Sequence, residues 1–237
     1  MRPGRLASES DDYRRQRDEL LKAEIALREQ LETVAALRRQ LPLDSDLPDY
    51  VFHEGPADLA QRGPIKEVRL SGLFHDPTKP LVMYQYMFGG AQNKPCRMCT
   101  MWVDGFNSVT HYLQETMNFA IIAQAGIREL REWGRRRNWH GLRLISSEGS
   151  EFKNALGFQN EGGRQWPGIS VFVLSQDGSV KHFYSACAQM ADHVNRGIDL
   201  LTPVWNLLDL TPYGRGEWMP RLEYSVETPS MAAPLSR

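Results

Sequence analysis

The sequence lacks the features by which proteins insert into membranes or bind nucleic acid. No apolar run approaches the roughly 20 residues that span a bilayer, and no apolar segment follows residues 1–6 as a signal peptide requires. The formal net charge is only −1, and the basic runs 14–17 and 135–137 are short enough to be solvated helix faces. We therefore expect a cytoplasmic protein with no membrane or nucleic-acid partner.

Cysteine is also scarce, which makes its placement informative. Of three cysteines in 237 residues, Cys96 and Cys99 stand three apart, between the apolar run 81–88 and a segment that predicts a helix. In the cytoplasm a C-x-x-C pair is more often catalytic or metal-binding than structural. Residues i and i+3 at a helix start share one face, so two sulfurs there can close a small disulfide ring. The positive helix end favours a thiolate. The spacing predicts Cys96 as the attacking thiolate and Cys99 as the resolving thiol.

Residues near the pair could support this chemistry. Arg97 would raise the thiolate fraction of Cys96, or would simply face solvent. Asp104 could accept the proton of Cys99, although an exposed turn acid before a glycine is the plainer interpretation. We expect Trp102 to be a core residue rather than part of a substrate-binding wall. Tyr86, near the end of the strand 81–88, is the strand residue that we expect to face substrate.

A metal-binding module is a second hypothesis. Cys96 and Cys99 with His182 and Cys187 would suit copper(I) or zinc, but no H-x3–5-H pair supplies the usual second half of a zinc site. Otherwise Cys187 is an inert buried thiol, and His182 is a half-buried histidine sharing a strand face with Tyr184. Dithiol exchange itself requires no cofactor.

The chain predicts an N-terminal helical arm, a larger domain and a short tail. Apolar residues recur every three or four positions through residues 8–41, and Pro42 and Pro48 follow. The heptad pattern is imperfect, so this helix could form a homodimer or pack on its own domain. We expect an arm over residues 1–45, a domain over 46–222 and a disordered tail over 223–237.

The pattern of the larger domain predicts an α/β fold. Strands are expected at 68–74, 81–88, 118–124 and 142–146, helices at 126–137 and 190–208, and a hairpin of 169–174 with 180–184. Strand, helix and strand followed by a hairpin and a helix is the order of a thioredoxin-like, three-layer fold with a mixed central sheet.

Several motifs carry a family resemblance. They are Tyr-Gln-Tyr-Met-Phe-Gly at 84–89, the C-x-x-C pair with residues 102–106, His-Phe-Tyr-Ser at 182–185 and Leu-Asp-Leu-Thr-Pro-Tyr-Gly-Arg at 208–215. On these the chain resembles, over residues 15–220, a bacterial family of unknown function predicted to contain thioredoxin-like dithiol–disulfide oxidoreductases. The resemblance implies a thioredoxin-like fold and a protein or small-molecule disulfide as substrate.

Two prolines bear on that resemblance. Thioredoxins carry a tryptophan directly before the first active-site cysteine, and this chain has Pro95 there. Thioredoxins also place a cis-proline before a central strand, facing the cysteines. Pro167, directly before the strand expected at 169–174, could supply it.

Two further functions stay open. Residues 68–74 are also similar to peroxiredoxin-like chains, which would make the protein a peroxide reductase. Peroxidatic sites usually carry threonine or serine three positions before the cysteine, however, and Asn93 stands there. The last hypothesis is a non-enzymatic interaction protein that uses its N-terminal helix.

Overall fold

The computed structural model describes residues 6–223 of the chain, which divides into two compact units, Met1–Pro42 and Leu43–Arg237. The tail expected over residues 223–237 lies, apart from Glu223, outside the described residues. Within residues 6–223, no helix combines the length and the apolar character that crossing a membrane would take.

The first unit is one long helix, α1 (Asp11–Arg39), as predicted. Ser10 caps it by accepting the N–H of Tyr13, and its first turn is acidic and its last turn basic, which suits the helix dipole. None of its side chains is buried. The apolar stripe therefore stays exposed, with Leu27 62% and Leu37 57% accessible.

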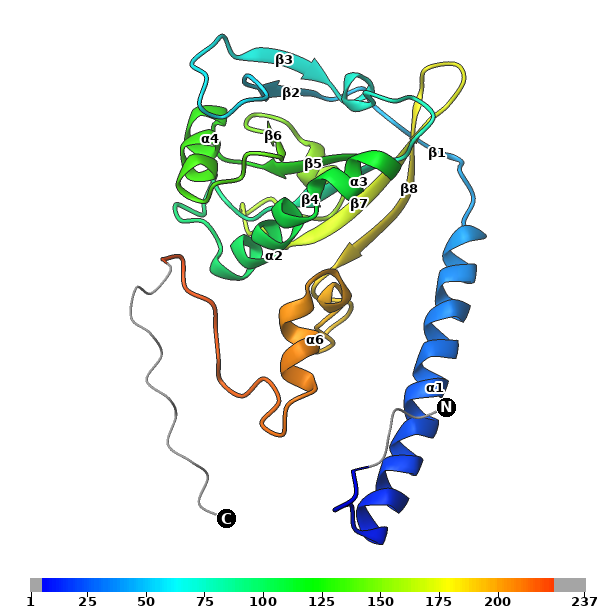
Figure 1. The fold of residues 1–237 in the computed structure, drawn as a ribbon. Helices are drawn as coiled ribbons and strands as arrows, with labels where there is room; N and C mark the ends of the chain where they lie inside the picture. Colours follow the sequence, from blue (N-terminus) through cyan, green and yellow to red (C-terminus); the bar gives the residue numbers. More distant parts are fainter. Residues whose placement is uncertain (1–5, 224–237) are drawn as a thin grey trace. The chain divides into compact units, whose positions relative to one another are not determined.

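The second unit is built on an eight-stranded sheet in the order β1-β8-β7-β4-β5-β6-β2-β3 (Figure 1). Its strands are β1 (Ser45–Leu47), β2 (Val51–Glu54), β3 (Lys66–Arg69), β4 (Leu81–Gln85), β5 (Asn118–Ala123), β6 (Arg143–Ser146), β7 (Gly168–Leu174) and β8 (Val180–Cys187). β4 and β5 pair in parallel, as do β5 and β6, while β7 runs antiparallel to both β4 and β8. The sheet is therefore mixed, as predicted.

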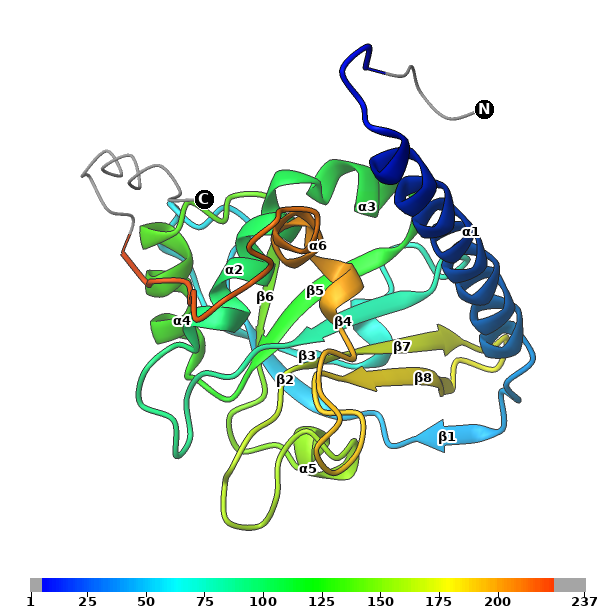
Figure 2. The same ribbon diagram turned by 90° about the horizontal axis from the view of Figure 1, so that it is seen from below.

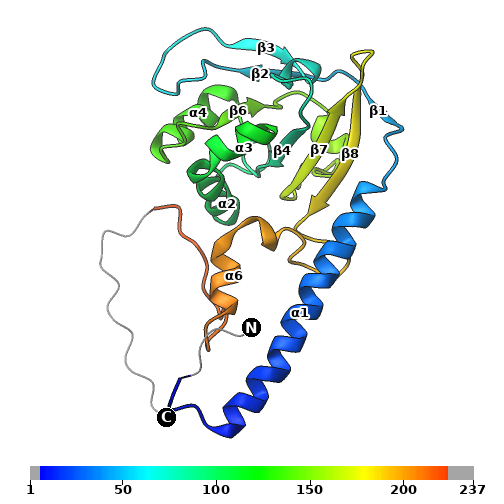
Figure 3. The same cartoon turned by 45° about the vertical axis from the view of Figure 1, so that its right-hand side comes forward.

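The connections give this sheet a thioredoxin-like core. β4 leads into α2 (Arg97–Ser108), α3 (Thr110–Thr116) and then β5, so β4 and β5 are joined by a helical crossover. The hairpin of β7 and β8, drawn in yellow in Figure 3, lies on the other side of β4, and α6 (Pro203–Asp209) follows it. The predicted α/β fold class is confirmed.

The two sheet faces bury separate cores. On one face lie α2, α4 (Ile127–Arg136) and α6 (Figure 2). The core on that face contains Tyr84, Tyr86 and Phe119. On the other, the 3-10 helix Ser71–Leu73 and α5 (Phe152–Ala155) cover alternate residues of the same strands, including Met83 and Phe172. β4 has both faces buried, which explains why its first four residues, 81–84, form a continuous apolar run.

Three predicted elements are wrong in part. The strand expected at 81–88 ends at Gln85. The strand expected at 68–74 ends at Arg69, because Asp49 accepts both the backbone N–H and the hydroxyl of Ser71 and holds a 3-10 turn there. The helix expected at 190–208 is only α6, preceded by the 3-10 helix Asp199–Leu201. His193 and Arg196 have positive φ angles, and Pro203 occupies the first turn of α6, where proline fits and where a longer helix would break.

The loop that carries the cysteines depends on a glycine with no room for a side chain. Gly89 has a φ of +84°, and a Cβ placed on it would meet the backbone of Ala125. Gly178, in the β7–β8 turn, has nearly the same φ, +85°, but no atom within 4 Å of such a Cβ. Alanine at Gly178 would therefore meet backbone strain alone, whereas alanine at Gly89 would meet both backbone strain and a steric clash.

We expect Gly178→Ala to lower the free energy of unfolding by about 1–2 kcal/mol, the cost of left-handed backbone. Gly89→Ala should cost at least about 3 kcal/mol, because the strand end and Ala125 must also separate. Urea unfolding monitored by tryptophan fluorescence compares the two variants. Equal losses would contradict the close approach at Gly89.

Candidate active site

The dithiol lies where the carboxyl end of β4 meets the start of α2. Cys96 is the N-cap residue of α2, and its backbone N–H donates to the carbonyl of Met87 at 3.0 Å. Its Sγ accepts the backbone N–H of Cys99 at 3.4 Å, as a capping side chain does. Gln92 donates to the carbonyls of Met87 and Lys94 and so closes the loop between strand and helix.

This position makes Cys96 the more acidic of the two thiols. The pKa of Cys96 is lowered to about 7, first by the hydrogen bond from the Cys99 side chain and then by the backbone N–H groups of Cys99 and Met98. Arg97 contributes a smaller electrostatic term in the same direction, and partial burial opposes the shift. A thiol with a pKa near ambient pH combines thiolate population with nucleophilicity.

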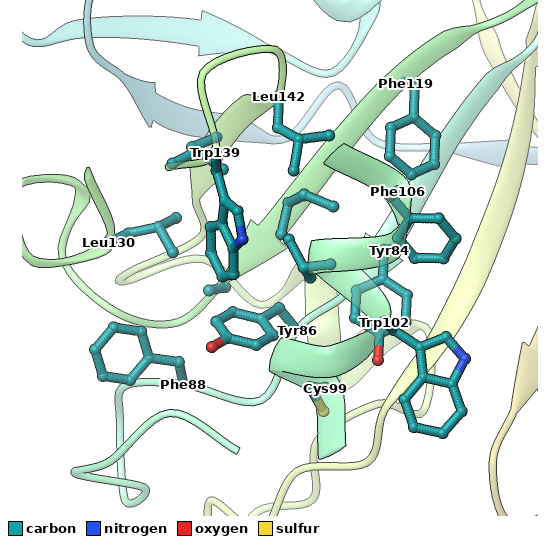
Figure 4. Packing of buried hydrophobic residues seen from close by; sticks show 14 of the residues in the cluster. Tyr84, Tyr86, Phe88, Cys99, Trp102, Phe106, Phe119, Leu130, Trp139 and Leu142 are labelled. Carbon is teal, nitrogen blue, oxygen red and sulfur yellow. The ribbon is translucent and has the colours of Figure 1, made fainter. Parts of the chain in front are cut away.

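Cys99 has the opposite environment. It lies on the buried side of the first turn of α2, fully inaccessible and beside Tyr84 and Trp102 (Figure 4). Burial, followed by its hydrogen bond to Cys96 and the charge of Cys96, raises the pKa of Cys99 well above its usual range. The backbone N–H of Met87 and the hydroxyl of Tyr84 act in the other direction, because both can donate to a thiolate. The pair is therefore asymmetric, with the nucleophile outside and the second thiol held protonated.

Tyr86 is fully buried, so the expectation that it faces substrate is wrong. Its hydroxyl lies 2.7 Å from Thr100 Oγ1 and accepts the indole N–H of Trp133 at 2.9 Å. Thr100 in turn donates to the carbonyl of Cys96 at 2.9 Å. The hydroxyl of Tyr86 is thus satisfied by partners within the fold, as a buried polar group requires. Through Thr100, Tyr86 helps to hold the first turn of α2.

Trp102 and Asp104 lie further along α2, away from the helix start. Trp102 is 4% exposed and donates its indole N–H to the carbonyl of Ile198, so it belongs to the core. Asp104 is half-buried, forms an ion pair with Arg137 and accepts the indole N–H of Trp139 at 2.8 Å. It is neither an exposed turn acid nor, with these partners, placed as an acceptor for Cys99.

Arg97 is exposed and Pro95 is half-buried, on either side of Cys96 in the chain, and their substrate-facing roles stay predictions. Pro167 directly precedes β7, whose first residue, Gly168, pairs with Gln85 at the end of β4. No peptide bond among the described residues is cis, so the Pro167 bond is trans and that expectation is wrong. Trans is the intrinsically favoured isomer, and the loop satisfies its ends in that form: Trp166 donates to Phe158, and Pro167 accepts from Ala188.

The alternative metal ligands are not brought together. Phe183 bulges out of the β7–β8 ladder, so Tyr184 pairs with Val171 while His182 pairs with Phe172. The bulge corrects the expectation that His182 and Tyr184 share a face. His182 packs on Phe172 in the core opposite the cysteines, and the part of the chain that the structure describes contains no cluster of His, Cys, Asp or Glu fit for a metal.

Cys187 is half-buried at the end of β8, opposite Gly168. Burial raises the pKa of its thiol, which agrees with the expected inert cysteine and gives no sign of a second nucleophile.

An open cavity of about 880 Å³ lies elsewhere, at the start of β5, and none of the cysteines lines it. Its charged side chains already have partners. Arg143 forms a two-point ion pair with Glu54 at 2.6 and 2.9 Å, and Arg131 donates to backbone carbonyls of residues 56–61. The cavity therefore supplies no free charged group for chemistry.

Sequence reasoning missed Lys153, because a single lysine in an irregular segment carries no pattern. Lys153 is fully buried in α5, and its Nζ donates to the carbonyl of Tyr86 at 2.9 Å and to Oε1 of Gln165 at 3.1 Å. Burial lowers its pKa from 10.5 to about 7. Since the unfolded amine titrates near 10.5, this shift lowers the free energy of unfolding as pH falls from about 10.5 toward 7.

Fold and site together define a thioredoxin-fold protein with a C-x-x-C dithiol at the start of the helix after its central strand. The chain belongs to a bacterial family of proteins of unknown function, DUF899, whose model matches residues 4–229. This confirms the resemblance to a bacterial family of unknown function, while the family description assigns neither a fold nor an activity. No curated protein matches the chain.

Solved structures with similar folds include redox proteins. AhpC of Enterococcus faecalis has 12% identity over 70% of this chain and 90% of its own, with a TM-score of 0.47. The mitochondrial 2-Cys peroxiredoxin of Plasmodium falciparum has 11% identity over 71% and 95%, with a TM-score of 0.46. A putative thioredoxin reductase of Burkholderia cenocepacia has 20% identity over 68% and 96%, also at 0.46. Likenesses at this level do not bear on the chemistry of this chain.

We expect the alkylation rate of Cys96, mapped by mass spectrometry, to rise with pH around a midpoint of about 7. Cys99→Ala should move that midpoint upward, because it removes the side-chain hydrogen bond that lowers the pKa most, while the backbone donors remain. Cys187→Ser is the matched control and should leave the midpoint in place. A wild-type midpoint near 9 would contradict the N-cap electrostatics.

Proposed function

We propose that this protein is a dithiol–disulfide oxidoreductase that acts on a protein or small-molecule disulfide. The observation that carries the proposal is the asymmetry of the pair: Cys96 caps α2 with a lowered pKa, while Cys99 is buried behind it with a raised pKa. A permanent structural disulfide or two inert thiols would not require this difference. Such a dithiol suits a reducing, cytoplasmic compartment.

The reaction follows from this geometry. The Cys96 thiolate attacks one sulfur of the substrate disulfide, forming a mixed disulfide and releasing the other sulfur as a thiolate. Cys99 then loses its proton and attacks Cys96 Sγ, which breaks the mixed disulfide and releases the second substrate thiolate. Two electrons pass to the substrate, and Cys96 and Cys99 end as a disulfide. A donor thiol of the cell must reduce that disulfide for another turnover.

A peroxide reductase is the second candidate, because the same lowered pKa would activate Cys96 toward a peroxide. Cys96 would attack a peroxide oxygen and become a sulfenic acid, releasing water or an alcohol, and Cys99 would condense with it to a disulfide and water. Asn93 is exposed in the loop before Cys96 and offers no hydroxyl at that position. Disulfide exchange is therefore the better-supported proposal.

We expect equilibration in glutathione buffers to show one two-electron transition of the pair, between roughly −120 and −270 mV. Cys96→Ser should abolish disulfide reduction. Cys99→Ser should trap a mixed disulfide at Cys96, because the resolving step is lost. Thiol counting and intact-mass measurement follow both, with Cys187→Ser as the control that keeps the transition.

Peroxide consumption by the same variants distinguishes the two candidates. Peroxide reduction much faster than disulfide exchange would favour the peroxidase. Thiols that show no transition and purify with a stoichiometric metal would overturn both redox proposals.

We also propose that α1 forms a homodimer through its exposed apolar stripe. Leu20, Leu27 and Leu31 are 52%, 62% and 42% exposed, and a contiguous apolar face of this kind marks an interaction surface. An isolated helix gains most of its stability from packing, so a second copy of the same stripe would stabilise both.

The double variant Leu27→Glu/Leu31→Glu should convert the dimer to a monomer in light scattering, because it buries charge in the contact. Ile25→Glu is the matched control, since Ile25 lies on the opposite face of α1 and is 50% exposed. A wild-type protein that is monomeric at high micromolar concentration would contradict the dimer.

A further inference from the structure

Lys153 is a buried amine with no anionic hydrogen-bond partner in the described structure. Its amine is completely inaccessible, and both of its hydrogen-bond partners, the Tyr86 carbonyl and the Gln165 amide, are neutral. The charge that acts on it is that of Cys99. A buried ammonium without an anion is costly, so its position next to a redox pair needs a reason.

One peptide group lies between Lys153 and Cys99. Lys153 Nζ donates to the carbonyl of Tyr86, and the N–H of that same Tyr86–Met87 peptide is the backbone donor to Cys99. A cation on the carbonyl polarises the peptide and makes its N–H a stronger donor. The amine can therefore stabilise negative charge on Cys99 through this peptide without touching the sulfur.

We propose that Lys153 is a positioning residue that compensates the buried charge of Cys99, holding a proton when Cys99 gives one up. This inference rests on the proposed dithiol exchange and concerns its resolving step. The buried groups pass from thiol and amine to thiolate and ammonium, so the proton count stays the same and the interior gains no net charge.

The remaining steps keep atoms and electrons balanced. The Cys99 thiolate forms a bond to Cys96 Sγ, and the bond between Cys96 and the substrate breaks, with its electron pair leaving on the substrate sulfur. Lys153 then carries a charge with no anion beside it and loses its proton to the solvent, where the released substrate thiolate can take one up. Protonation of Lys153 is thereby tied to the redox state of the pair.

The other groups around Cys99 do not fill this role. Burial raises the pKa values of the Tyr84 and Tyr86 hydroxyls, so both stay protonated. Cys96 Sγ is bonded to the substrate sulfur in the mixed disulfide at this stage and carries no charge. On α5 and the neighbouring loop, the charged groups Glu151 and Arg164 are exposed. Lys153, with a pKa of about 7, is the group placed to change protonation near neutral pH.

The test uses the full chain carrying a glutathione mixed disulfide at Cys96, with resolution followed as glutathione release over pH 5–10. Lys153→Met removes the amine but keeps a straight, unbranched side chain of nearly the same length. We expect resolution to slow about 10-fold at pH 7 and its pH profile to move up by about one unit, while alkylation of Cys96 changes less than about twofold. Arg97→Met is the matched cation control and should shift Cys96 alkylation instead.

Lys153→Met with the wild-type resolution rate and pH profile would overturn the inference while leaving the proposed function standing. A wild-type protein that never resolves its mixed disulfide would overturn the proposed function itself. Should Lys153→Met fail to fold, carbon-13 NMR of the Lys153 side chain in wild-type protein gives an independent readout. We expect a higher Lys153 pKa in the reduced than in the oxidised protein, and equal values would refute the coupling.

Discussion

The hydrogen bond from the backbone N–H of Cys96 to the carbonyl of Met87 holds the start of α2 against the end of β4. In this position Cys96 caps the helix, because its Sγ faces the backbone N–H of Cys99. The contact also brings Cys99, in the first turn of the helix, beside the N–H of Met87. A helix moved by a fraction of a turn would keep both cysteines and lose the electrostatic difference between them.

That difference depends on burial as much as on hydrogen bonds. Cys96 and Cys99 are chemically identical thiols three residues apart, and their pKa values move in opposite directions because one lies at the helix end and the other inside the core. The surrounding polar groups are arranged for this interior. Tyr86 and Thr100 hold the helix turn, and Lys153 places a titratable amine behind the strand end. The site therefore combines a partly exposed nucleophile, Cys96, with two buried titratable groups, Cys99 and Lys153.

Much of the frame could be predicted from local pattern. The run 81–84 is apolar because both faces of β4 are covered, and the period of α1 is visible because helical spacing repeats over many turns. The expectations that failed depended on distant contacts. Asp49 turns the end of β3, a bulge at Phe183 moves His182 to the other face, and Tyr86 is enclosed by Trp133 and Thr100. Each of these partners is remote in sequence or breaks the regular alternation.

The sequence by itself determined the dithiol, its place after a buried strand and before a helix, and the α/β order of the elements, because spacing and periodicity are local properties. Only the tertiary structure decided which residues surround the sulfurs. Lys153 comes from α5, more than fifty residues beyond Cys99, and reaches Tyr86 because β4 lies at the centre of the sheet with α5 packed behind its end. Burial and the charges that accompany it arise from such long-range packing, which no local pattern encodes.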